Sequence, residues 1–141
     1  MDRIHEMKTP KEIIKLMMSK DAFSTWMNIQ VNAIEKGSCS LSCVIKGEML
    51  NGFSIAHGGI AYSLADSTLA FAANSYGYQS FSIETSISHL VKVKKEDTLM
   101  SISKEIHRGK KTALYHIEIF NQNKELIALM KGTVYISKIV W

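Results

Sequence analysis

Apolar and polar side chains alternate along two neighbouring segments in the first third of the chain. In residues 27–33 the odd positions are apolar and the even positions are Asn or Gln. In residues 38–45 the alternation returns, with Cys39, Leu41, Cys43 and Ile45 on one face. A period of two is typical of a strand with one buried face, and Glu35-Lys36-Gly37 between the segments is a turn signal. The pattern predicts a β-hairpin whose first strand starts at Met27.

The residues before this hairpin predict a short helix. Thr9-Pro10-Lys11-Glu12 has the form of a capping box with proline at the first helical position. The helix is expected to run from Pro10 to about Lys20. We therefore divide the chain into an N-terminal helical arm, residues 1–24, and a single domain, residues 25–141.

The middle of the chain is almost free of charge. Residues 49–83 hold one charged side chain, Asp66, if histidine is neutral. Within this segment Gly58 to Tyr76 predicts a long helix, apolar around nearly its whole circumference, with Gly77 as the residue that ends it. A helix that is apolar on all sides must be enclosed, and at this length protein rather than lipid encloses it.

Four further strands are predicted after this helix, at about 80–93, 97–107, 111–121 and 125–137. The connections are short and polar, and Arg108-Gly109-Lys110 is one of them. An antiparallel meander is the simplest topology for strands joined in this way. The expected fold class is α+β, with a curved antiparallel sheet wrapped around a central long helix and a short helix at the N-terminus.

Composition limits the class of protein. The 141 residues, 46% hydrophobic and 21% charged, fit one compact domain. No apolar stretch approaches the ~20 residues that span a bilayer, and the N-terminus lacks the pattern of a secretory signal. Cys39 and Cys43 belong to no metal-binding motif, and on one strand face they would lie about 13 Å apart, too far for a disulfide. We expect buried thiols, no metal, no membrane and a cytoplasmic protein.

The formal net charge is +4, and the basic residues gather in the C-terminal part. Lys92, Lys94, Lys95, Lys104, Arg108, Lys110 and Lys111 form the cluster. Nucleic acid is one partner for such a cluster, but the interleaved aromatic residues that stack on bases are missing. A small polyanionic ligand and a merely solvated face fit equally well.

Two features near the start of the long helix could support chemistry. Gly58-Gly59 opens the helix, and unpaired backbone N–H groups there could stabilise negative charge on a carbonyl oxygen. Asp66 is expected to be buried in its uncharged segment, and a carboxylate perturbed by burial is of the kind that acid–base and nucleophilic catalysis use. Seven residues place Gly59 and Asp66 on nearly the same helix face but about 10 Å apart along the axis. If two such helices pack antiparallel across a two-fold axis, Gly59 of one copy faces Asp66 of the other. The spacing therefore predicts a dimer with shared sites.

Simpler interpretations of the same residues remain open. A lone aspartate in a buried helix is often satisfied by nearby hydroxyl groups, and Ser63, Ser67 and Thr68 are available. His57 alone fits a residue at the start of a helix, and Asn51 before Gly52 fits a turn.

Taken together, these motifs resemble a known family. Asn51, His57-Gly58-Gly59, Ala65-Asp66 and Asn74-Ser75-Tyr76-Gly77 are similar to the PaaI-like branch of the hotdog-fold thioesterases, over roughly residues 28–137. The resemblance implies that residues 25–141 are one hotdog thioesterase domain. It also implies hydrolysis of acyl-CoA thioesters, in dimers that often pair into tetramers. We expect no cofactor.

The resemblance also implies roles for individual residues. Asp66 takes the position of the catalytic carboxylate, as general base or nucleophile, and Gly59 that of the backbone N–H that binds the thioester oxygen across the dimer. Asn51 and His57 match the polar pair that orients the thioester or the attacking water, and Ser82 matches a water-positioning hydroxyl.

The resemblance further places Gly58 and the Arg108-Gly109-Lys110 turn among substrate-binding residues, the turn toward the CoA phosphates. One strand departs from the pattern. Ser88-His89-Leu90-Val91-Lys92 stands where many relatives carry Asn-Phe or Asn-Tyr followed by proline. Since this strand helps to line the acyl tunnel, the departure concerns substrate preference.

Three other functions compete. A hotdog hydratase or dehydratase would show a His paired with an acid and a proline-containing loop, and neither is present. A non-catalytic acyl-CoA sensor would keep the pocket, although binding alone gains nothing from a buried charge. A nucleic-acid-binding module comes third.

Overall fold

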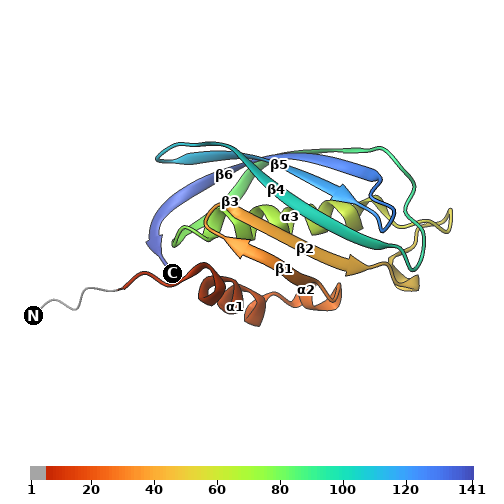
Figure 1. The fold of residues 1–141 in the computed structure, drawn as a ribbon, viewed down its shortest axis with the longest axis horizontal. Coiled ribbons are helices and arrows are strands. Elements are labelled where there is room, and N and C mark those ends of the chain that lie inside the picture. The colour runs from red at the N-terminus through yellow and green to blue at the C-terminus, as the bar shows by residue number, and fades with distance from the viewer. Residues whose placement is uncertain (1–5) are drawn as a thin grey trace, which may run out of the picture.

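A computed structural model describes residues 6–141 of the chain. Six antiparallel strands form one curved sheet around the long helix α3 (Gly58–Asn74), as Figure 1 shows. The strands are β1 (Gln30–Glu35), β2 (Ser38–Val44), β3 (Tyr78–His89), β4 (Thr98–Arg108), β5 (Thr112–Phe120) and β6 (Leu126–Val140). A 3₁₀ turn, η1 (Gly47–Met49), precedes α3. The predicted α+β architecture is confirmed.

The N-terminal helix α1 (Pro10–Lys20) has the predicted bounds. The Thr9 hydroxyl accepts from the Glu12 amide, and the Glu12 carboxylate accepts from the Thr9 amide. A second short helix, α2 (Ala22–Trp26), was not predicted; Asp21 caps it by accepting from the Ser24 amide at 2.9 Å. Because Met27 closes α2, the first strand begins at Gln30 and not at Met27.

The predicted hairpin of β1 and β2 is confirmed. Gly37 in its turn has φ +76°, a conformation that favours glycine, and a Cβ there would lie 2.5 Å from the Tyr76 hydroxyl. Cys39, Leu41 and Cys43 face the core as expected, and both cysteines are free thiols.

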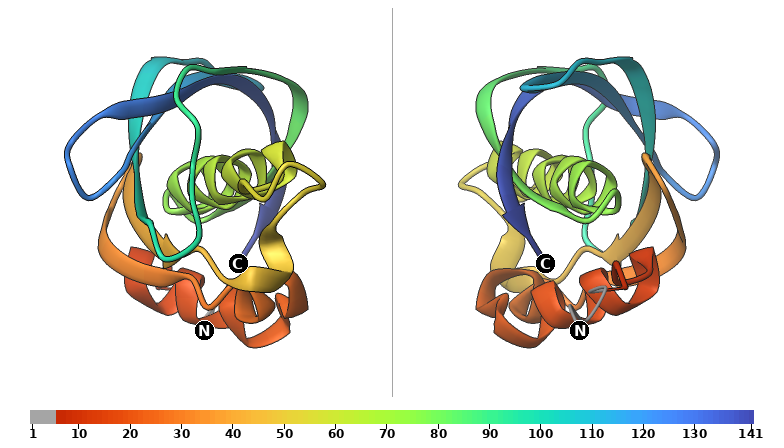
Figure 2. Two further views of the ribbon diagram at one scale, coloured as in Figure 1. Left: turned by 90° about the vertical axis from the view of Figure 1, so that its right-hand side faces the viewer. Right: turned by 90° about the vertical axis from the view of Figure 1, so that its left-hand side faces the viewer.

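The meander prediction is right for β4, β5 and β6 and wrong for β3. The strand order is β1-β2-β4-β5-β6-β3, so β3 lies at the far edge beside β6. Residues 90–97 cross over the end of the molecule where α3 begins (Figure 2). Along this path the Leu90 amide donates to Ile127 of β6, and the Glu96 amide donates to Ile45 just after β2. A hairpin between β3 and β4 is thereby excluded, because β5 and β6 occupy the positions between them.

Helix α3 is the centre of the core, but one stripe of it stays partly open. Leu64, Leu69 and Phe71 are fully buried, and Gly132 on β6 allows close approach, since a Cβ there would meet Leu69 at 2.5 Å. The half-buried positions recur at helical spacing: Gly59, Tyr62, Ser63, Asp66, Ser67 and Ala70. Protein covers most of this helix, as expected, and a single copy leaves this one stripe half-buried.

The helix ends at Asn74, two residues before the predicted Tyr76. The Asn74 side chain accepts from the Ser80 amide at 2.9 Å and donates to the Ser80 carbonyl at 2.8 Å. These bonds reverse the chain within a few residues. As a result, β3 runs back along α3.

Candidate active site

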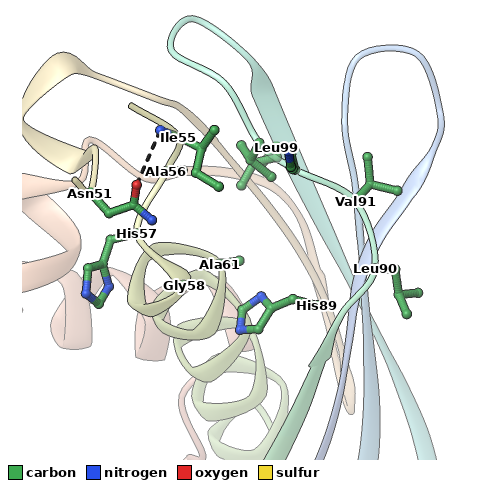
Figure 3. A pocket seen from close by; sticks show the side chains of 12 residues that line it. Asn51, Ile55, Ala56, His57, Gly58, Ala61, His89, Leu90, Val91 and Leu99 are labelled. Carbon is green, nitrogen blue, oxygen red and sulfur yellow. Dashed lines mark hydrogen bonds between the residues drawn. The ribbon is translucent and has the colours of Figure 1, made fainter. Parts of the chain in front are cut away.

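The loop before α3 fixes Asn51 at the edge of a pocket. The Asn51 side-chain oxygen accepts from the amides of Phe53, at 2.9 Å, and Ile55, at 3.4 Å. These bonds make Asn51 a turn residue, as one interpretation of the sequence held. Its side-chain NH₂ has no hydrogen-bond partner within residues 6–141, and Asn51 also lines the pocket in Figure 3. It can therefore stabilise the loop and still donate to a ligand.

His57 caps α3 through its side chain. Its Nδ1 accepts from the Gly59 amide at 3.0 Å, and its carbonyl accepts from the Ile60 amide at 2.9 Å. The Gly58 amide has no such partner among the described residues. The sequence pointed to Gly59 as the donor to a carbonyl oxygen, whereas the capping bond leaves the Gly58 N–H as the available one.

Asp66 lies on the half-buried stripe of α3. Burial raises the pKa of its carboxyl group, the Ser82 hydroxyl on β3 lowers it in part, and the negative charge of Asp21 raises it further. Ser82, which the family resemblance assigned to positioning of the attacking water, therefore acts on the Asp66 carboxylate in this structure. Asp21 was not expected there; it comes close through the unpredicted junction of α1 and α2.

The hydroxyl groups next to Asp66 in sequence are bonded elsewhere. Ser63 donates to the Gly59 carbonyl at 2.7 Å, Thr68 donates to the Leu64 carbonyl at 2.7 Å, and Ser67 pairs with Ser24 at 2.9 Å. The interpretation of Asp66 as a structural residue satisfied by these three hydroxyls is therefore wrong. The hydroxyl that acts on its carboxylate is that of Ser82 on β3.

A pocket of about 280 Å³ opens where α3 begins. The pre-helix loop, the start of α3 and residues 89–93 line it, with Leu99 of β4 at its back. In Figure 3, His57 and His89 lie on opposite sides of the first turn of α3. In the sequence, the segment that contains His89 stands out only as a departure from the family pattern. His89 lies beside Gly58 because β3 runs back along α3, and no local motif predicts that course.

The Arg108-Gly109-Lys110 turn lies at the other end of α3 within one chain. The Arg108 guanidinium stacks on the Tyr76 ring, 3.7 Å from its centroid. The Gly109 amide donates to the Thr112 carbonyl at 2.8 Å and so closes the turn, while Lys110 is exposed. The turn and the pocket are therefore not brought together in a single copy.

Among the described residues, no three His, Cys, Asp or Glu side chains meet in a group that could hold a metal ion. Within residues 6–141, no helix has both the length and the apolar character needed to cross a membrane.

Comparison with known proteins decides the family. Residues 53–128, which include the first turn of α3 and Asp66, match the model of the thioesterase superfamily. The chain belongs to this superfamily. The PaaI acyl-coenzyme A thioesterase of Escherichia coli is 34% identical over 116 residues, 82% of this chain and 83% of that protein. This thioesterase is therefore PaaI-like, as the sequence motifs indicated.

Solved structures show the same fold. The Escherichia coli PaaI protein superposes on this thioesterase with a TM-score of 0.90 and 30% identity, covering 93% of this chain and 95% of the other. A Streptococcus mutans protein bound to acetyl-CoA gives a TM-score of 0.76 at 26% identity, covering 78% of this chain and 89% of the other. The curved sheet around a central helix is thus the hotdog fold.

Proposed function

We propose that this thioesterase hydrolyses acyl-CoA thioesters to the free acid and CoA. The observation that carries the proposal is Asp66, a half-buried carboxylate of raised pKa on the open stripe of α3, with the Ser82 hydroxyl beside it. The similarity to a relative named as an acyl-coenzyme A thioesterase and to a protein bound to acetyl-CoA supports CoA as the thiol.

We further propose that the active protein is a homodimer with two shared sites. Gly58 and Asp66 of one helix lie about 12 Å apart along the axis, too far to serve one carbonyl group. The stripe of α3 is half-buried in one copy, and β3 is an edge strand on which Phe81 and Ile83 are 56% and 58% exposed. An unpaired edge strand with apolar side chains favours pairing with another chain. Two copies related by a two-fold axis would cover both surfaces.

Pairing of two dimers into a homotetramer is a further part of the proposal. The outer face of the sheet carries an apolar group formed by Met100, Ile102 and Phe120. Met100 and Ile102 are 42% and 44% exposed. Burial of such a group against a second dimer would be favourable.

In the proposed reaction, Asp66 of one copy takes a proton from water while the resulting hydroxide attacks the thioester carbonyl carbon. The carbonyl oxygen becomes an oxyanion, which the Gly58 N–H of the other copy stabilises, aided by the positive end of the helix dipole. The intermediate then breaks its C–S bond, and the CoA thiolate takes the proton from Asp66. Asn51 and Ser82 orient the thioester and the water. His57 holds Gly59 and thereby the direction of the Gly58 N–H.

The alternative role for the same carboxylate is direct attack on the thioester carbon, which gives an acyl–Asp66 anhydride. Label found in Asp66 after a single turnover in ¹⁸O-labelled water with excess enzyme would show that the anhydride forms. Attack by water places the label in the released acid, whereas hydrolysis of the anhydride at the aspartyl carbon places it in Asp66.

The basic turn Arg108-Gly109-Lys110 fits the phosphates of CoA. Of the two shared sites, it would serve the one whose Asp66 comes from the same chain. Arg108 stacks on Tyr76, which lies ten residues beyond Asp66, or about 15 Å along the helix direction. An extended pantetheine arm can cover that span. Arg108 and Lys110 would supply the positive charge, and Gly109 shapes the turn.

Release of free thiol from a panel of phenylacetyl-, benzoyl- and short to long straight-chain acyl-CoA esters tests the proposal. Turnover of at least one ester, linear in enzyme concentration, is expected. Tight binding of acyl-CoA without thiol release would instead indicate a sensor protein. The absence of both would reject the proposal.

A further inference from the structure

A second histidine, His89, lies beside Gly58, the residue whose N–H is proposed to bind the thioester oxygen. It is the last residue of β3, and its imidazole Nε2 lies 3.3 Å from the point where a Cβ on Gly58 would stand. The ring has no hydrogen-bond partner among residues 6–141, and the residue is exposed. The imidazole ring thus lies beside the first residue of α3 and forms no hydrogen bond within the described residues.

The pocket next to this ring is small and has no acidic side chain. Twelve residues line it, and most are apolar, among them Ala61, Leu90 and Leu99. Its volume of about 280 Å³ lies at the small end of the range of ligand pockets, about 300–1,000 Å³. That space suits a short acyl group. A hydrogen-bonding group on such an acyl chain would meet imidazole, amide or ammonium groups of this chain, and the Asp66 carboxylate of the other copy would face the thioester carbon.

We infer that His89 determines the acyl specificity of this thioesterase and favours short acyl groups that carry a hydroxyl or keto oxygen at carbon 3. The inference rests on the proposed hydrolysis of acyl-CoA. In this arrangement the Gly58 N–H holds the thioester carbonyl oxygen, and the His89 imidazole forms a hydrogen bond with the second oxygen of the substrate. An acyl group without that oxygen forms one hydrogen bond fewer in the site.

The distance between His89 Nε2 and the Gly58 nitrogen suits two oxygens that are close together in the substrate. The Gly58 nitrogen is about 2.5 Å from its own Cβ position, so His89 Nε2, 3.3 Å from that position, lies within about 6 Å of the Gly58 nitrogen. Both donors reach an oxygen at about 2.7–3.2 Å. A carbonyl oxygen and an oxygen on carbon 3 can meet both donors together, whereas a polar group at the far end of a long chain cannot.

Hydrolysis of matched four-carbon CoA esters tests this inference. Butyryl-CoA, 3-hydroxybutyryl-CoA and acetoacetyl-CoA differ only at carbon 3, and kcat/KM is measured for each with the wild type and with His89→Phe, His89→Gln and His116→Gln. His116 lies on β5 with its side chain on the outer face of the sheet, away from the pocket, and serves as the control.

The wild type is expected to prefer the two oxygenated esters over butyryl-CoA by roughly five- to tenfold, the size of one net hydrogen bond. His89→Phe should bring the ratio near one, His89→Gln should keep part of it, and His116→Gln should leave it unchanged. If the wild type hydrolyses these esters without preference, or if His89→Phe keeps the preference, the inference is wrong and the proposed function stands. If no ester of any chain length is hydrolysed, the proposed function fails and takes the inference with it.

Discussion

The amide of Gly59 donates to Nδ1 of His57 at 3.0 Å and is therefore occupied by the cap of its own helix. This bond distinguishes two adjacent glycines that are equivalent in the sequence. It leaves Gly58, the first residue of α3, with the N–H group that can meet a substrate. The contribution of that single N–H can be measured by substitution.

Gly58→Pro should reduce kcat by roughly 100- to 1000-fold, as loss of one oxyanion donor does in other enzymes. Proline lacks the N–H and is well tolerated at the first position of a helix. The preceding residue, His57, has φ −57° and ψ 137°, which a following proline accepts.

Gly58→Ala is the matched control for this change. It adds the same Cβ, 3.3 Å from the exposed His89 ring, but keeps the N–H. Steady-state kinetics should show a much smaller loss than for proline, with circular dichroism confirming that both variants fold. Equal losses in the two variants would mean that crowding, and not the amide, controls the rate.

The shared site predicts recovery of activity when two inactive variants are mixed. Asp66→Asn should lose at least about 100-fold in kcat, as removal of a general base does, and Gly58→Pro loses the other half of the site. In a mixed dimer one site carries both lesions and the other carries neither. Random exchange of subunits should therefore restore about a quarter of wild-type activity. Thiol release after joint refolding measures it, and no recovery would place both groups in sites within one chain.

Much of the fold was predictable because its signals are local. The capping box at Thr9, the alternation of residues 38–45 and the uncharged helix each depend on neighbours in sequence, and each was recovered. The position of β3 was not, because a strand after a turn can pair with any free edge. Its place beside β6 depends on the Asn74–Ser80 bonds and on residues 90–97, which cross to the other side of the sheet.

Sequence motifs name the candidate residues of the site but not the details of its geometry. Asn51, His57, Gly58 and Asp66 stand in one compact motif, which sequence reasoning can identify. Which glycine amide stays free depends on the rotamer of His57, and the pKa of Asp66 depends in part on the charge of Asp21. Both are tertiary effects that residue spacing does not encode.

The two cysteines should be inert in the native protein. Burial raises the pKa of the Cys39 thiol to about 12 and of the Cys43 thiol to about 11. Since the thiolate is the reactive form, almost none is present at pH 8. A thiol reagent should therefore detect no protein thiol until denaturant is added, and two afterwards. Rapid labelling of the folded protein would show that the buried face of β2 becomes accessible to solvent in the native state. Slow labelling would also keep the background low in the thiol-release assay.

The pH dependence of kcat/KM should report the surroundings of Asp66. Its pKa is raised above the ordinary value of about 4 by burial first, with Ser82 opposing and Asp21 adding to the shift. Because the base must be deprotonated, the rate should rise with pH through this raised pKa.

Asp21→Asn removes a like charge and keeps a side chain that can cap α2, so the midpoint should move to lower pH. Ser82→Ala removes a bond to the carboxylate, so the midpoint should move to higher pH. Glu118→Gln on β5 should not move it. Shifts in the same direction for Asp21→Asn and Ser82→Ala would show that a group other than Asp66 controls the profile.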